Sequence, residues 1–245
     1  MIKTAIFVEG QTELIFTREL ILKYFEWQNI WVECYNLFND RELNEEEYSF
    51  KFPDANFYFQ IINVGNDVKV LSSILRREKY LFSENQKFDK IIGLRDMYSK
   101  DYREIVKNSS ISEEVNNKFI SEHQKTISSK SVNPEKIIFH FAIMEIESWI
   151  LGIKNLFSRL NNRLTYDAIE QHTGISLADN DPETTIFHPA ALISEILQIV
   201  GDNYDKKKGE VNKFLGNITK EDFAELLKSN KCNTFNSFCK SIKIE

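Results

Sequence analysis

The sequence predicts an α/β protein whose mostly parallel sheet is flanked by helices. Apolar segments of strand length alternate with segments of helical periodicity, which is typical of parallel strands joined by right-handed crossovers. Three of the strand-like segments end on a carboxylate, at Glu9, Asp96 and Glu145. Because parallel strands present their carboxyl ends at one edge of the sheet, we expect these three acids to converge.

The first predicted strand and helix contain the most informative stretch. An apolar run ends at Val8, Glu9-Gly10 makes a turn, and a helical pattern follows with Glu13 in its first turn. Glu9 and Glu13 are four residues apart, so both side chains can face one point. A carboxylate at the end of a buried strand is costly unless it is paired, and a cation would relieve that cost. Glu13 could also complement the helix dipole, so these residues alone leave metal ligation and a structural role open.

Further strands and helices are predicted along the chain. The expected strands cover residues 29–38, 57–64, 88–96 and 137–144, and the expected helices cover 68–80, 164–172, 189–200, 209–215 and 220–228. Residues 40–48 are expected to form a charged connection, and residues 108–130 a polar segment broken at serine pairs. Thr165 and Thr219 precede helical patterns and are candidate N-caps.

Composition predicts an ordinary globular protein. The chain has 245 residues, with 42 % apolar and 28 % charged side chains. A change of character near residue 156 predicts an α/β domain over residues 1–155 and a helical C-terminal region over 156–245, packed on it. The apolar runs are too short to span a bilayer and the start shows no secretory pattern, so we expect a cytoplasmic protein without a membrane partner. Three cysteines without a CxxC pair predict reduced thiols, with neither a disulfide framework nor a zinc site.

The charge and the acids together indicate a metal site. A net charge of −6 is not the basic footprint of a protein held on nucleic acid by charge alone. It is compatible with a nuclease, because clustered carboxylates present a positive centre once a divalent ion is bound. Oxygen ligands of this kind suit Mg²⁺ or Mn²⁺. The chain has no Gly-rich phosphate loop, so we expect no ATP hydrolysis.

Several short motifs share the pattern of acids that follow strands. V-E-G-x-T-E covers Val8 to Glu13, an apolar strand ends at Asp96, and E-x-E covers Glu145 to Glu147. Later segments agree with them: D-P-E at residues 181–183, H-P-A at 188–190 and Y-D-K at 204–206. Over most of its length the chain therefore resembles the TOPRIM superfamily, and within it the small OLD-like TOPRIM proteins of bacteria.

This resemblance implies a TOPRIM-like fold and a Mg²⁺- or Mn²⁺-dependent endonuclease that hydrolyses DNA or RNA. It also implies an effector of anti-phage defence that acts alongside a partner ATPase. By the same resemblance the metal ligands are Glu9, Glu13, Asp96, Glu145 and Glu147. Glu9 and Asp96 would be catalytic through the metal, and Lys206 is the candidate for the lysine near the scissile phosphate, with Lys100 as an alternative.

The chain departs from the family pattern at Tyr98. The usual D-x-D reads Asp96-Met97-Tyr98 here, and the next acid is Asp101. The number of metals, one or two, therefore stays open. The alternative to a nuclease is a non-catalytic TOPRIM-like module that binds a partner ATPase or nucleic acid. Exposed C-terminal helices could also form a homodimer.

Overall fold

The computed structural model describes residues 1–39, 42–46, 48–206 and 210–244. The chain divides into two compact units. The first unit comprises Met1–Arg95, Asn116–Phe141 and Ile244, and the second comprises Asp96–Val115 and Ala142–Lys243. These limits differ from the predicted boundary at residue 155. The division into a domain over residues 1–155 and a helical region over 156–245 therefore stays a prediction.

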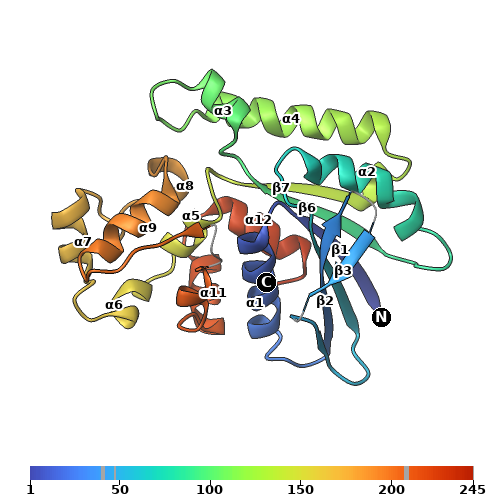
Figure 1. The fold of residues 1–245 in the computed structure, drawn as a ribbon, viewed down its shortest axis with the longest axis horizontal. Coiled ribbons are helices and arrows are strands. Elements are labelled where there is room, and N and C mark those ends of the chain that lie inside the picture. The colour runs from blue at the N-terminus through green and yellow to red at the C-terminus, as the bar shows by residue number, and fades with distance from the viewer. Residues whose placement is uncertain (40–41, 47, 207–209, 245) are drawn as a thin grey trace. The chain divides into compact units, whose positions relative to one another are not determined.

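The first unit is built on a mixed, mostly parallel sheet, which confirms the predicted α/β class (Figure 1). Within the described residues the strand order is β3-β2-β5-β1-β6-β7, and β4 pairs with β2 outside this path. β2 pairs in parallel with β5, β5 with β1, and β1 with β6, whereas β3 and β4 run antiparallel to β2. The strands are β1 Ile2–Val8, β2 Ile30–Phe38, β3 Glu42–Glu45, β4 Phe50–Lys51, β5 Phe57–Asn63, β6 Lys90–Asp96 and β7 Ile137–Ala142.

Strand β1 pairs on both edges, and its apolar residues 5–8 are fully buried. Its register places Val8 opposite Asn63 of β5 and Leu94 of β6. Ala5 and Phe7 share a core with residues of α2 (Lys69–Leu81) and α4 (Glu113–Lys130). Alternate residues of a strand point to the opposite face, which helix α1 (Gln11–Tyr24) covers (Figure 1).

Two predictions about the polar segments are wrong. Most of residues 108–130 form helix α4, whose inward positions Phe119, His123 and Ile127 are spaced four residues apart. The His123 ring lies 4.9 Å from the Phe139 ring of β7, measured between centroids, so this narrow stripe is enough to pack the helix. Within the predicted connection 40–48, residues Glu42–Glu45 form the edge strand β3; residues 40, 41 and 47 lie outside the described residues.

The second unit confirms the predicted helical C-terminal region. Its helices are α3 Lys100–Ile105, α5 Glu147–Leu151, α6 Leu156–Leu160, α7 Tyr166–Thr173, α8 Pro182–Thr185, α9 Pro189–Gln198, α10 Asn212–Leu215, α11 Lys220–Lys228 and α12 Asn233–Ser241. Thr165 caps α7, and Thr219 caps α11 in a capping box with Asp222, as predicted. Among the described residues, no helix combines the length and apolar character needed to cross a membrane.

Candidate metal centre

Asp96 is the last residue of β6 and is almost fully buried, with 3 % of its surface exposed. Its Oδ1 atom accepts a hydrogen bond of 2.9 Å from the backbone N–H of Ile146. The backbone beyond Asp96 is also fixed, because the N–H groups of Met97 and Tyr98 donate to the carbonyls of Ala142 and Met144. The segments that follow β6 and β7 are therefore held side by side.

The loop after β7 brings two more acids to this place. Met144 adopts a left-handed backbone conformation, with φ of 59°, which is uncommon for a residue with a side chain and gives a tight turn. Glu145 follows at once, and its Oε2 atom accepts a 2.9 Å hydrogen bond from the backbone N–H of Ala190 in the first turn of α9. The carboxylates of Glu145 and Asp96 are thus each held by a hydrogen bond from a backbone N–H group.

Glu147 is the first residue of α5 and is fully buried. Its Oε1 atom accepts a 2.8 Å hydrogen bond from the hydroxyl of Tyr204. A buried carboxylate with a single neutral donor would be costly, because removing an ion from water costs several kcal/mol. An ionised Glu147 therefore requires a compensating cation nearby.

Lys206 is a cation that meets this requirement in the described structure. Its Nζ atom lies 2.5 Å from Oδ2 of Asp96 and 3.1 Å from Oε2 of Glu147. The Lys206 side chain is 27 % exposed, whereas those of Asp96 and Glu147 are buried. The neighbouring Lys207 and Lys208 lie outside the described residues.

The three carboxylates are close enough to share a metal ion. Asp96, Glu145 and Glu147 each offer one oxygen, and these oxygens lie within 4.8 Å of one another. An octahedral Mg²⁺ with bonds of about 2.1 Å holds its ligand oxygens about 3 to 4 Å apart. A small side-chain movement would bring the three oxygens to these separations, so the residues fit a hard divalent cation bound through oxygen.

Four of the predicted site residues are brought together, and two are described elsewhere. Asp96, Glu145, Glu147 and Lys206 all belong to the second unit. In the first unit, Glu9 follows β1 and is partly exposed, whereas Glu13 is buried in the first turn of α1. Their role as metal ligands stays a prediction of the sequence.

The remaining sequence candidates take other positions. Tyr98, which replaces the second Asp of the expected D-x-D, packs edge-on against Phe187 and His188, with ring centroids 5.5 and 5.1 Å away. Lys100 is exposed on α3 and lies 3.8 Å from Glu104 of the same helix, measured from Nζ to Oε1. Tyr98 is thus placed by aromatic packing, and Lys100 is not part of the acid cluster.

Three short motifs of the C-terminal half, H-P-A, Y-D-K and D-P-E, supply hydrogen-bond partners that were not predicted from the sequence. H-P-A supplies the Ala190 N–H that binds Glu145, and Y-D-K supplies both the Tyr204 hydroxyl and Lys206. D-P-E supplies Glu183, whose Oε1 atom accepts a 2.8 Å hydrogen bond from Nε1 of Trp149 in α5. All three motifs therefore contact the segment that carries Glu145 and Glu147 or the helix that follows it.

Fold and site together define an α/β chain that carries a cluster of three carboxylates, two of them buried, at the end of a sheet strand. Residues 8–243 match the protein family described as Domain of unknown function (DUF4276), and the chain belongs to this family. No curated protein and no solved structure matches the chain.

Proposed function

We propose that the chain is a phosphodiesterase that depends on Mg²⁺ or Mn²⁺ and hydrolyses DNA or RNA. The observation that carries the proposal is the cluster of Asp96, Glu145 and Glu147, whose ligand oxygens lie within 4.8 Å of one another. A site made of oxygen ligands suits these two ions. The resemblance to OLD-like TOPRIM proteins supports the choice of nucleic acid as substrate, and the proposed role in anti-phage defence with a partner ATPase rests on that resemblance alone.

The residues around the acids support a preorganised ligand set. The N–H groups of Ile146 and Ala190 and the hydroxyl of Tyr204 each bind one carboxylate oxygen. Donors of this kind orient the ligands of a metal site. The other carboxylate oxygens of these two acids, Oδ2 of Asp96 and Oε2 of Glu147, contact the ammonium group of Lys206.

The proposed chemistry divides between the cofactor and the chain. A bound divalent ion supplies Lewis acidity and lowers the pKa of a coordinated water. The carboxylates of Asp96, Glu145 and Glu147 would hold that ion. Lys206, once displaced from two of these carboxylates, would place its ammonium group against a phosphoryl oxygen and stabilise negative charge there.

A metal titration with matched variants tests the proposal. Mn²⁺ binding is followed by electron paramagnetic resonance, and cleavage of plasmid DNA, single-stranded DNA and RNA is assayed with Mg²⁺ or with EDTA. Asp96→Asn is expected to lower Mn²⁺ affinity by roughly tenfold to a hundredfold and to abolish Mg²⁺-dependent cleavage. Asp167→Asn makes the same change at an exposed acid in the first turn of α7 and should behave as the wild type. The absence of Mn²⁺ binding by the wild type would overturn the proposal.

Lys206 also favours a second candidate, a non-catalytic module that binds a partner ATPase or nucleic acid. An ammonium group 2.5 Å from Asp96 and 3.1 Å from Glu147 already neutralises buried charge, as a metal would. A module of this kind would bind no Mn²⁺ through these acids and would cleave no substrate. Its Lys206→Met variant would lose stability without any change in metal binding.

A further inference from the structure

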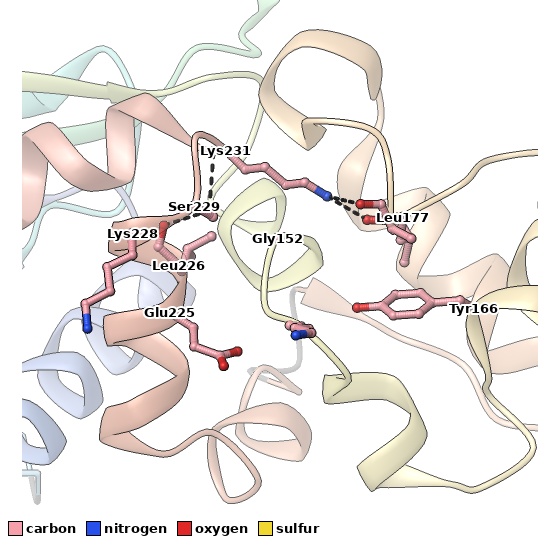
Figure 2. A pocket seen from close by; sticks show the side chains of 10 residues that line it. Gly152, Tyr166, Leu177, Glu225, Leu226, Lys228, Ser229 and Lys231 are labelled. Atoms are coloured by element: carbon pink, nitrogen blue, oxygen red, sulfur yellow. Dashed lines mark hydrogen bonds between the residues drawn. The ribbon is translucent and has the colours of Figure 1, made fainter.

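The second unit contains a cavity of about 400 Å³ that is separate from the acid cluster (Figure 2). None of the residues that line it belongs to the group Asp96, Glu145 and Glu147. The lining comes from the end of α5, the start of α7, the loop before α8, and the end of α11 with the loop that follows it. This volume falls within the range of roughly 300–1,000 Å³ that is usual for small-molecule sites.

The rim of the cavity is positively charged. Lys154, Lys228 and Lys231 line it together with a single acid, Glu225. Lys154 and Lys228 are exposed and form no ion pair within the part of the chain that the structure describes. Lys231 donates from Nζ to the carbonyls of Leu177 and Ala178, at 3.0 and 2.6 Å. An ammonium group has three N–H donors, so one donor of Lys231 remains for a ligand.

Two neutral or acidic groups add directional contacts. The hydroxyl oxygen of Tyr166 accepts a 2.9 Å hydrogen bond from the backbone N–H of Asn155, so its own hydrogen remains to be donated. Figure 2 shows the Tyr166 hydroxyl and the Glu225 carboxylate pointing from opposite sides toward the same space. The cavity therefore offers a hydroxyl donor and a carboxylate acceptor in addition to the lysines.

The wall of the cavity is apolar. Leu177 and Leu226 are buried in the protein core and present carbon atoms to the cavity. A wall of this kind contacts an apolar or aromatic group and not a hydrated ion. The lining thus combines a surface for an apolar group, a positive rim for an anion, and an acceptor for hydroxyl groups.

We propose that this cavity binds a nucleoside monophosphate. Its base would lie against Leu177 and Leu226, and its phosphate would take charge-assisted hydrogen bonds from the lysine ammonium groups and from Tyr166. Glu225 would accept hydrogen bonds from the ribose hydroxyls, a role that carboxylates take in dinucleotide sites. An inorganic ion would leave the apolar wall uncovered, and a sugar phosphate would leave most of it uncovered. The proposal does not depend on the nuclease function.

Calorimetric titration of the full-length chain in EDTA tests the proposal without the metal site. The probes are AMP, GMP, CMP and UMP, with adenosine, ribose 5-phosphate and inorganic phosphate as truncated ligands. At least one nucleotide is expected to bind at least roughly tenfold more tightly than each truncated ligand. A 5′-phosphorylated tetranucleotide that binds as tightly would identify the end of a nucleic acid as the source of the ligand, whereas binding of the mononucleotide alone would identify the free compound.

Matched variants locate the binding. Lys154→Glu and Tyr166→Phe are each expected to weaken nucleotide binding by roughly tenfold or more. Lys240→Glu reverses an exposed lysine of α12 that does not line the cavity and should leave the affinity unchanged. Three results would each overturn the proposal: no binding of the four nucleotides at 10 mM, which is about the weakest affinity of interest; binding of inorganic phosphate or ribose 5-phosphate that equals nucleotide binding; or equal effects of Lys154→Glu and Lys240→Glu.

Discussion

The ammonium nitrogen of Lys206 lies 2.5 Å from Oδ2 of Asp96, although 110 residues separate the two in the chain. The same nitrogen is 3.1 Å from Oε2 of Glu147. A lysine in this position stabilises two buried carboxylates by the same electrostatic attraction that a divalent ion would use. Lys206 and a metal ion would therefore compete for the same oxygens.

Replacement of Lys206 by Met tests this competition. Methionine keeps an apolar stem of similar length and removes the charge, so a divalent ion no longer has to displace an ammonium group. Mn²⁺ affinity is expected to rise by roughly tenfold, measured by electron paramagnetic resonance at constant pH and ionic strength. Nucleic acid cleavage is expected to fall, because the group proposed to contact the phosphate is gone. Lys213→Met, at a lysine that pairs with Asp202, is the control and should change neither quantity. Unchanged Mn²⁺ affinity in Lys206→Met would contradict the competition.

Replacement of Glu9 by Gln tests the ligand that the sequence predicts in the first unit. If Glu9 contributes to the metal site, Mg²⁺-dependent cleavage is expected to fall by roughly a hundredfold, because a neutral amide is a poor ligand for a hard cation. Rates of cleavage at several Mg²⁺ concentrations provide the measurement. Glu84→Gln, at a glutamate whose side chain is 96 % exposed, is the matched control. Wild-type rates in Glu9→Gln would remove Glu9 from the site and leave the second-unit acids as the ligand set.

The acids of the cluster could be predicted because a strand signal precedes each of them. The apolar runs before Asp96 and Glu145 form β6 and β7, and parallel topology explains why strand ends are useful places to search. Their hydrogen-bond donors could not be predicted in the same way. The N–H groups of Ile146 and Ala190 belong to the backbone, which gives no residue-specific signal, and the contact of Tyr204 with Glu147 spans 57 residues.

The missed elements of the fold have physical reasons of their own. Helix α4 packs through a narrow stripe that includes Phe119 and Ile127, so its mean composition is that of a polar segment. Strand β3 reads Glu-Leu-Asn-Glu and lies at the sheet edge, where charged residues are common and no apolar alternation is required. Helix α12 contains Asn, Thr and Ser, which are weak helix formers, and it is held by the buried Phe235 and Phe238.

Glu183 is predicted to be a stability determinant of the second unit. It accepts hydrogen bonds from Nε1 of Trp149 and from the backbone N–H of Thr234, and burial raises the pKa of its carboxyl group. Glu183→Ala leaves buried donors with fewer acceptors and is expected to lower the free energy of unfolding by about 2–4 kcal/mol. Equilibrium urea denaturation measures this change. Glu170→Ala, at an exposed position of α7, should stay within about 0.5 kcal/mol of the wild type. Equal stabilities of the two variants would show that the Glu183 contacts contribute little.

His140 in β7 is predicted to make the free energy of unfolding vary with pH in the acidic range. Desolvation by burial lowers the pKa of its imidazole to about 4 in the folded chain, whereas a histidine in an unfolded chain has a pKa of about 6.5. Between these two values the unfolded state binds a proton that the folded state does not, so the free energy of unfolding falls as the pH falls from about 6.5 to about 4. The full effect is at most about 3 kcal/mol, because His140 is only partly buried and solvent screens its charge.

The test compares the wild type with His140→Asn, which has no group that titrates in this window. Urea denaturation gives the free energy of unfolding of both proteins at a series of pH values from about 7.5 to about 4.5. This range is chosen from the pKa values of the unfolded and the folded chain. The wild type is expected to lose more stability on acidification than His140→Asn. His172→Asn, at an exposed histidine of α7, is the matched control and should retain the wild-type slope. Parallel pH profiles for the wild type and His140→Asn would show that His140 does not titrate differently in the folded chain.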